Sequence, residues 1–193
     1  MRIITGTARG IRLETPEGED TRPTLERVKE AVFSSIQFDI EGRRFLDLFS
    51  GSGQNALEAL SRGAALAVMV DSSPEAIEVM KINAKKTKLF DRCRIVNYQY
   101  DTYLRGAAGR EQFDLIYLDP PFGGDPLREV LRKLDRSGVA APHAIIICET
   151  ESPDLFEGDM DLASRYHVQK SAKYGRIHVT YLAPVLSDGG GEP

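Results

Sequence analysis

Between residues 44 and 150 the sequence alternates short apolar runs with helical segments. The apolar runs predict five strands, in RFLDLF (44–49), ALAVMV (65–70), RIVNY (94–98), FDLIYLD (113–119) and HAIIICET (143–150). The segments between them predict helices at 54–63, 73–89 and 125–138, with a shorter helix or turn around 101–108. Strands that are apolar on both sides and separated by helices are typical of a parallel sheet covered on both faces. The alternation therefore predicts an α/β fold.

Two further regions flank this alternation. The segment YHVQKSAKYGRIHVTYLA (166–183) predicts two strands joined near Lys173–Gly175, so at least one strand should run antiparallel. At the other end, residues 1–20 predict a short hairpin or arm, and apolar residues at helical spacing predict a helix after Pro23. The expected organisation is an N-terminal arm with an appended helix (1–40), one α/β domain (41–186) and a flexible tail (187–193).

The composition is ordinary for a soluble globular chain. No apolar stretch is long enough to span a bilayer or to form a signal peptide, so we expect a cytoplasmic protein. Cys93 and Cys148 lie in apolar runs without metal-ligand spacing, and no metal site is predicted. The net charge of −4 argues against a strongly basic nucleic-acid binder. However, residues 1–12 and 163–186 contain basic residues and no acidic ones. These ends are either a positive face for an anionic partner or ordinary solvated surface.

A glycine turn follows the first strand of the alternating region. Gly51 and Gly53 have no Cβ atoms, which allows a tight turn and a close approach of ligand to backbone. Asp71, twenty residues after Gly51, ends the next strand, where a carboxylate can accept the hydroxyl hydrogens of an adenosine ribose. The spacing Gly51-x-Gly53-x-x-Ala56 fits a dinucleotide as well as S-adenosylmethionine, and a purely structural turn is the third interpretation. Asp101, after the third strand, is either an acceptor for the adenine amino group or a helix N-cap.

The residues Asp119, Pro120, Pro121 and Phe122 follow the fourth strand, at the same edge of the sheet as the glycine turn. The prolines end strand pairing and stiffen the backbone, which fixes two acceptors, the Asp119 carboxylate and the Pro120 carbonyl. Two acceptors match the two hydrogens of a planar amino group and direct its nitrogen lone pair at an electrophile. Phe122 offers a face on which a base can stack, worth about 1–3 kcal/mol. A sulfonium methyl group fits as the electrophile, whereas a nicotinamide accepts nothing useful from an amine. The plain alternative is a turn that ends a strand.

Taken together, these motifs resemble one family along most of the chain. The matching stretches are RIITGTARGIRL, RPTLERVKEAVFSSI, LDLFSGSGQNALEALSRGA, FDLIYLDPPF and KYGRIHVTYL. The chain is similar to the bacterial RsmD family, class I S-adenosylmethionine-dependent methyltransferases that modify N2 of a guanine in 16S ribosomal RNA. The resemblance implies a Rossmann-like, mostly parallel seven-stranded sheet with an antiparallel C-terminal strand, and S-adenosyl-L-methionine as cofactor. Two departures from the family are Gly53-Gln54-Asn55-Ala56 in place of Gly-Ala-Leu-Gly, and Asp71 in place of glutamate.

The resemblance also implies roles for single residues. Those that would hold the target guanine are Asp119, Pro120 and Phe122. Those that would contact the cofactor are Asp47, Phe49, Gly51, Ser52, Gly53, Asp71 and Asp101. Those that would contact RNA phosphates are Arg9, Arg12, Arg22 and Lys173. The implied partner is 16S ribosomal RNA, the small ribosomal subunit or an assembly intermediate. The resemblance also implies a protein that acts as a monomer and does not associate with a membrane. A base in folded RNA must leave its stack to reach Phe122.

Other functions remain open on sequence alone. Methylation of adenine N6 in DNA uses the same motif, although the chain has no room for a separate target-recognition domain. Glutamine amides of proteins are a further acceptor of similar geometry. A nicotinamide-dependent oxidoreductase explains the glycine turn and Asp71 but neither the Asp119–Phe122 motif nor the terminal hairpin. The remaining alternative is a binding module with an inactive site, although every expected catalytic position carries a residue suited to its role.

Overall fold

The computed structural model describes residues 1–16, 23–121 and 126–185, so the predicted tail at 187–193 lies outside the described residues. The helices are α1 (Pro23–Ser35), α2 (Gln54–Ser61), α3 (Pro74–Lys86), the 3₁₀ helix η1 (Phe90–Arg92), α4 (Tyr100–Ala107), α5 (Pro126–Ser137) and α6 (Met160–Ser164). The strands are β1 (Arg44–Asp47), β2 (Leu66–Asp71), β3 (Cys93–Asn97), β4 (Phe113–Leu118), β5 (Ala140–Thr150), β6 (Tyr166–Tyr174) and β7 (Ile177–Pro184). Within the described ranges, none of the helices combines the length and the apolar character that crossing a membrane requires.

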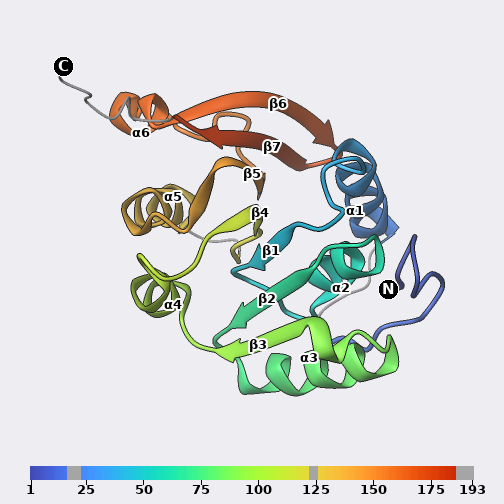
Figure 1. Cartoon of the computed structure of the whole chain (residues 1–193). Helices are drawn as coiled ribbons and strands as arrows, with labels where there is room; N and C mark the ends of the chain where they lie inside the picture. Colours follow the sequence, from blue (N-terminus) through green and yellow to red (C-terminus); the bar gives the residue numbers. More distant parts are fainter. Residues whose placement is uncertain (17–22, 122–125, 186–193) are drawn as a thin grey trace.

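The strands form one seven-stranded sheet in the order β3-β2-β1-β4-β5-β7-β6 (Figure 1). The pairs β1–β2, β2–β3, β1–β4 and β4–β5 are parallel. Strand β7 runs antiparallel to both of its neighbours, β5 and β6. The predicted mostly parallel sheet with an antiparallel C-terminal strand is therefore confirmed. The strand order reverses between β1 and β4, and open α/β sheets bind ligands at such a switch point.

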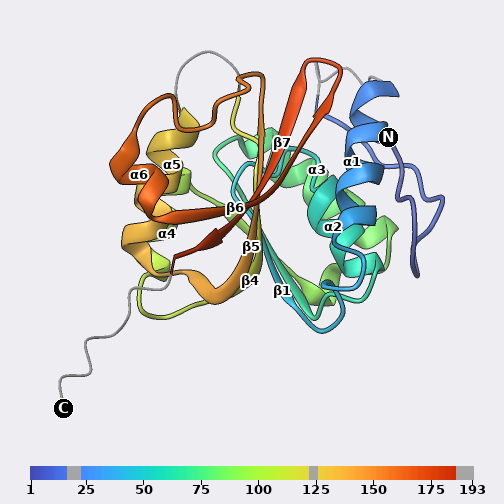
Figure 2. The same cartoon turned by 90° about the horizontal axis from the view of Figure 1, so that it is seen from above.

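Helices cover both faces of the sheet, with α1, α2 and α3 on one side and α4, α5 and α6 on the other (Figures 1 and 2). Successive strand residues face opposite sides, so Phe45 and Tyr117 belong to one core cluster while Leu46 and Leu118 belong to the other. Because both faces are buried, the central strands are continuously apolar, which is the pattern that predicted them.

Two of the strands predicted between residues 44 and 150 have a boundary that differs from the predicted one by more than one residue. Strand β1 ends at Asp47, so Leu48 and Phe49 lie in the following turn. The reason is local, since the Asp47 carboxylate accepts a hydrogen bond from Phe49 N (3.3 Å) and its carbonyl accepts one from Ser50 Oγ (3.1 Å). Strand β5 begins at Ala140 rather than at residue 143, and its register with β4 is irregular at that end.

Residues 1–14, called the N-terminal arm below, pack against α2 and α3 on the α1 side of the sheet (Figure 2). Glu58 of α2 is fully buried and accepts hydrogen bonds from Ile4 N (2.7 Å) and Thr5 N (3.0 Å). Ser61 Oγ, at the end of α2, donates to the Thr5 carbonyl (2.6 Å). Buried polar contacts therefore fasten the arm to the α/β core.

Candidate active site

The glycine turn and the Asp119 loop leave neighbouring parallel strands at one edge of the sheet. Asp47, the last residue of β1, lies opposite Tyr117 of β4. Leu48 N also donates to the Tyr117 carbonyl (3.3 Å), so the two strands stay paired up to the start of both loops. The two motifs that the sequence analysis treated separately therefore share the switch-point edge.

The glycine turn adopts a backbone that requires its glycines. Gly51 and Gly53 have φ of 49° and 78°, in the left-handed region that residues with side chains rarely adopt. A Cβ atom on Gly53 would lie 2.9 Å from Met69 Sδ and 3.1 Å from Met80 Cγ. Backbone conformation and the limited space beside two methionine side chains therefore both favour glycine at position 53. Ser52 between the two glycines is buried.

Asp71 ends β2, where the sequence placed it, and its carboxylate braces two loops. One oxygen accepts from Gly51 N (2.9 Å) and the other from Ser73 N (2.9 Å). Ser73 is the N-cap of α3, and its hydroxyl accepts from Ala76 N (3.3 Å). This bracing of the glycine turn is a role of Asp71 that the sequence analysis missed.

Asp47 is a buried acid at the start of the glycine turn, with only 1% of its surface exposed. Burial, together with the nearby charges of Asp119 and Asp71, raises the pKa of Asp47 to about 7, although the hydrogen bond from Phe49 N opposes the shift. Its Oδ2, and Oε1 of Gln54 at the other end of the turn, are buried without hydrogen-bond partners among the described residues. The turn therefore offers two buried acceptors to a ligand that carries donors.

A second buried acid lies behind the site, where the Tyr117 hydroxyl donates to Glu149 of β5. Burial and then the charge of Asp47 raise the pKa of Glu149, while the hydrogen bond from Tyr117 opposes the shift. Burial also raises the pKa of Tyr117 well above its ordinary value, so the hydroxyl keeps its proton. The sequence analysis missed this pair, although Glu149 is the one acidic residue in the apolar run 143–150.

Asp119 follows β4 directly and is half-buried, Pro120 is buried and Pro121 is exposed. The Asp119 charge contributes to the raised pKa of both Asp47 and Tyr117, so its carboxylate lies on the side of these buried groups. Phe122, the expected stacking residue, lies outside the described residues.

Phe49 packs against the start of α4, the helix that carries Asp101. The Phe49 ring lies 5.4 Å from the ring of Tyr100, centroid to centroid. Asp101 is the second residue of α4, and the N-cap is Gln99, so the N-cap interpretation of Asp101 is wrong. Its carboxylate instead contacts Arg105 (3.6 Å) and Lys133 (3.9 Å).

Of the basic residues expected to contact RNA, Lys173 lies at the edge of the sheet that carries the site. It is exposed near the end of β6 and pairs with His178 of β7, which pairs in turn with Thr150 at the end of β5. Arg22 lies outside the described residues.

Arg9 and Arg12 are exposed on the N-terminal arm, where Arg12 forms an antiparallel bridge with Arg2. The arm turn that carries Arg9 is held by Thr7 N, which donates to the carbonyl of Ser61 (2.9 Å). Ser61 is the last residue of α2, so Arg9 lies toward the opposite end of this helix from the glycine turn. Arg9, Arg12 and Lys173, the described residues that were expected to contact RNA, therefore do not form one cluster.

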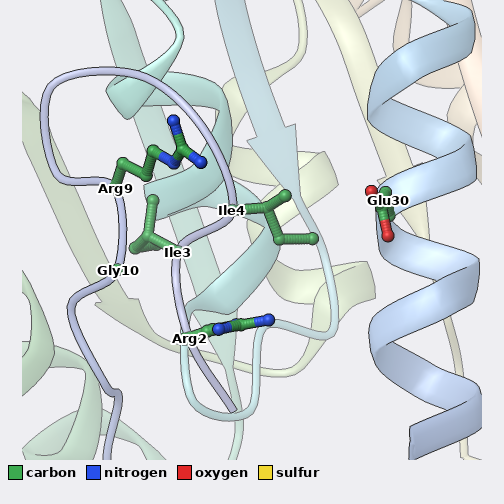
Figure 3. Close-up of a pocket in the computed structure, with 6 residues that line it drawn as sticks. All are labelled: Arg2, Ile3, Ile4, Arg9, Gly10 and Glu30. Carbon is green, nitrogen blue, oxygen red and sulfur yellow. The ribbon is translucent and has the colours of Figure 1, made fainter.

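A cavity of about 220 Å³ lies beside this part of the arm, between the arm and α1 (Figure 3). Its lining residues are Arg2, Ile3, Ile4, Arg9, Gly10 and Glu30. The cavity is separate from the switch-point edge, and Arg9 of the arm and Glu30 of α1 both line it (Figure 3).

Comparisons with known proteins agree with this arrangement. The family described as "Conserved hypothetical protein 95" matches residues 1–183. The chain is 34% identical to "Ribosomal RNA small subunit methyltransferase D" of Escherichia coli strain K12, over 78% of this chain and 75% of that protein. It is 32% identical to the protein of the same name from Haemophilus influenzae, over 78% of this chain and 79% of the relative.

Solved structures show the same architecture. The Escherichia coli protein described as "Putative methyltransferase yhhF" superposes with a TM-score of 0.82 at 28% identity, covering 95% of this chain and 97% of that one. The methylase HI0767 of Haemophilus influenzae gives a TM-score of 0.78 at 26% identity, over 96% and 98% of the two chains. These matches confirm the Rossmann-like methyltransferase fold. With the family match over residues 1–183 and the relatives above 30% identity, the chain belongs to the RsmD family, the family of ribosomal RNA small subunit methyltransferase D.

Proposed function

We propose that this protein transfers a methyl group from S-adenosyl-L-methionine to the exocyclic N2 amine of a guanine in 16S ribosomal RNA. Family membership supports methylation of ribosomal RNA, because the relatives in the family carry that activity in their names. The observation that carries the proposal is the acidic switch-point edge, where Asp47 Oδ2 and Gln54 Oε1 are buried acceptors without donors in the described part of the chain.

The charge of this edge favours S-adenosylmethionine over a dinucleotide. Asp47, Asp71 and Glu149 lie at the ends of three strands of the sheet, and none of them forms an ion pair with a described residue. A ligand with a sulfonium and an ammonium group offers positive charge and hydrogen-bond donors to such acids. A pyrophosphate would bring negative charge close to Asp71 and Asp119, and because it carries no donors it would leave the buried acceptors of Asp47 and Gln54 unpaired. The nicotinamide-dependent alternative is disfavoured for this reason.

Several residues fit the parts of this cofactor. Gly51 and Gly53 expose backbone without side chains, and Asp47 and Gln54 offer acceptors to its ammonium end. Asp71 already accepts two backbone hydrogen bonds, but carboxylate oxygens have further lone pairs for ribose hydroxyls. When bound, the cofactor supplies an electrophilic methyl group on a positively charged sulfur.

The Asp119 loop would orient the acceptor amine. The Asp119 carboxylate and the Pro120 carbonyl each accept one N–H hydrogen, which points the nitrogen lone pair toward the glycine turn. In the transfer, the new N–C bond would form as the S–CH3 bond breaks and S-adenosylhomocysteine leaves. The nitrogen would become positive, and one of its protons would pass to Asp119 or to water. The contribution of the protein is alignment and electrostatics, without a covalent enzyme intermediate.

The direct test is methyl transfer to small-subunit RNA from cells that lack this protein. Labelled cofactor, wild-type protein and either naked RNA or isolated small subunits are combined, and the product nucleoside is identified by mass spectrometry. We expect N2-methylguanine in RNA and no transfer to DNA. Transfer to adenine in DNA, or no transfer to either RNA substrate, would contradict the proposal.

Asp119→Asn tests the catalytic assignment with little change in shape. We expect S-adenosylhomocysteine to bind with wild-type affinity, while kcat falls by about 10²-fold or more, since a preorganised electrostatic partner is removed. Asp39→Ala, at an exposed aspartate in the turn after α1, is the control and should keep full activity. Wild-type turnover in Asp119→Asn would remove Asp119 from the mechanism.

A further inference from the structure

Asn83 of α3 is fully buried and joins two distant parts of the chain. Its Oδ1 accepts a hydrogen bond from Glu14 N (2.8 Å). Its Nδ2 donates to the carbonyl of Glu14 (2.9 Å) and to the carbonyl of Ser52 (2.9 Å). One amide side chain thus pairs with both backbone groups of Glu14, as a neighbouring strand would, and also reaches the glycine turn. Both amide hydrogens are used.

At Glu14 the contact with Asn83 secures the end of the N-terminal arm. The Glu14 side chain also forms an ion pair with Lys86 (2.7 Å), but both side chains are largely exposed, so this pair contributes little. Leu13, the preceding residue, packs into the core, and the other polar fastenings, at Lys29, Glu58 and Ser61, hold the first half of the arm. The buried amide of Asn83 is therefore the main polar contact that holds Glu14 on α3.

The backbone conformation at Ser52 depends on Asn83, because the glycines on either side of Ser52 restrict it little. The Ser52 carbonyl and the Gly53 N–H belong to one peptide plane. Gly53 N donates to the Ser50 carbonyl (2.7 Å), and the Ser52 carbonyl accepts from Asn83, so both ends of this plane are bonded. Without Asn83, a buried carbonyl would lose this donor and the plane could rotate at low cost, since glycine tolerates most backbone angles.

We propose that Asn83 is a positioning residue that sets the Ser52–Gly53 peptide for cofactor binding and couples the glycine turn to the docked arm. The inference rests on the proposed function, which places the cofactor on this turn. Because one side chain serves both partners, a ligand that orders the turn also orders the arm. The coupling is reciprocal, so docking of the arm favours cofactor binding.

Hydrogen exchange of the wild-type protein tests the coupling without any substitution. We expect bound S-adenosylhomocysteine to slow exchange of the Ala8 and Glu14 amides by about threefold or more, although neither residue belongs to the glycine turn. Unchanged exchange at these amides in the saturated complex would overturn the inference while leaving the proposed function intact. If calorimetry shows that the wild-type protein does not bind S-adenosylhomocysteine, the proposed function fails and the inference with it.

Asn83→Ala and Ser61→Ala form a matched pair of variants. Each removes buried hydrogen bonds to the arm, since Ser61 Oγ accepts from Ala8 N (3.0 Å) and donates to the Thr5 carbonyl (2.6 Å). Of the two side chains, Asn83 alone also contacts the glycine turn. We expect Asn83→Ala to weaken S-adenosylhomocysteine binding by about tenfold or more and Ser61→Ala by less than about threefold, with both proteins folded by circular dichroism.

The hydrogen exchange of the arm in these two variants distinguishes a positioning role of Asn83 from a general effect on stability. In Asn83→Ala, bound S-adenosylhomocysteine at saturation should no longer slow exchange at Ala8, whereas in Ser61→Ala the Glu14 amide should still respond. Equal decreases of affinity in the two variants, or wild-type affinity in Asn83→Ala, would show that Asn83 is only structural. If Asn83→Ala does not fold, Asn83→Asp keeps the acceptor for Glu14 N, removes the donors to the Glu14 and Ser52 carbonyls, and should show the same decrease of affinity.

Discussion

Asp47 shows how one buried carboxyl group in the candidate site can cost stability. Its pKa is raised from 3.8 to about 7 by burial, so folding disfavours the charged form. Below pH 3.8 the group is protonated in both states and costs nothing. As the pH rises toward 7 the unfolded chain ionises first, and the free energy of unfolding falls. Above pH 7 the cost is constant, at up to about 4 kcal/mol.

Asp47→Asn should therefore stabilise the protein above neutral pH. The amide oxygen can still accept from Phe49 N, while the buried charge is gone. We expect the free energy of unfolding at pH 8 to rise by up to about 4 kcal/mol, with no gain near pH 3.5, and cofactor affinity to fall. Urea denaturation of both proteins across this range is the measurement. A stability difference that does not change with pH would contradict the assignment.

Tyr117 and Glu149 share one hydrogen bond. Conservative substitutions of the two residues should have opposite effects on the free energy of unfolding. Tyr117→Phe leaves the buried Glu149 carboxyl without its donor and should lower the free energy of unfolding by about 1–3 kcal/mol. Glu149→Gln keeps an acceptor for the hydroxyl and removes a carboxyl whose pKa is raised by burial. It should stabilise the protein at neutral pH and have no such effect below pH 4.5, the ordinary pKa of the group. Denaturation curves at two pH values separate these outcomes, and destabilisation of both variants at neutral pH would contradict this account of the pair.

At the scale of elements, the strands and long helices were predictable because their apolar spacing extends over several residues. The helix α6, with five residues, and η1, with three, are too short for such a pattern and were missed. The positions of Asp71 and Asp119 at the switch-point edge were predictable because each ends an apolar run. Asn83, Glu58 and Glu149 were not, because their roles depend on contacts with residues far away in the sequence.

Docking of the N-terminal arm on α2 depends on the absence of a side chain at Gly6. A Cβ atom there would lie 1.8 Å from the carbonyl oxygen of Ser61, and φ of Gly6 is +88°. Gly10 provides a matched control, because its φ is +84° and no atom of the described residues lies within 4 Å of the same position. Gly10→Ala should cost only the backbone strain, about 1–2 kcal/mol.

Gly6→Ala should cost clearly more than Gly10→Ala and should expose the arm. Thermal unfolding measures the first effect, and limited proteolysis within residues 1–16 measures the second. Equal melting temperatures for the two variants would show that the arm is not seated on Ser61 as described.

At the scale of the whole molecule, the charges are divided between an acidic edge and two basic segments. The net charge is −4, but residues 1–12 and 163–186 contain no acidic residue. RNA affinity should therefore come from a few local contacts rather than from the overall field. Removal of one lysine or arginine that binds a phosphate should reduce the slope of log affinity against log salt by about 0.7–0.9.

Lys173 and Arg9 should contribute to the binding of RNAs of different sizes. Lys173 lies at the edge of the sheet that carries the site, three strand positions from β4, or about 14 Å. Arg9 lies near the C-terminal end of α2. The eight residues of this helix separate that end from the glycine turn by about 12 Å. A short oligonucleotide around the target base can reach Lys173, whereas only a folded RNA domain can also reach Arg9.

Lys173→Ala should therefore weaken binding of both a short single-stranded RNA and a folded small-subunit domain, with a smaller salt slope for each. Arg9→Ala should weaken binding of the folded domain alone. Fluorescence anisotropy titrations at several salt concentrations measure both effects, and Lys88→Ala, at a basic residue after α3, is a control for total charge. If Arg9→Ala weakens short and folded RNA equally, the arm contacts RNA close to the target base. The substrate would then cross the face that carries α1 and α2 and leave the β6–β7 turn uncovered.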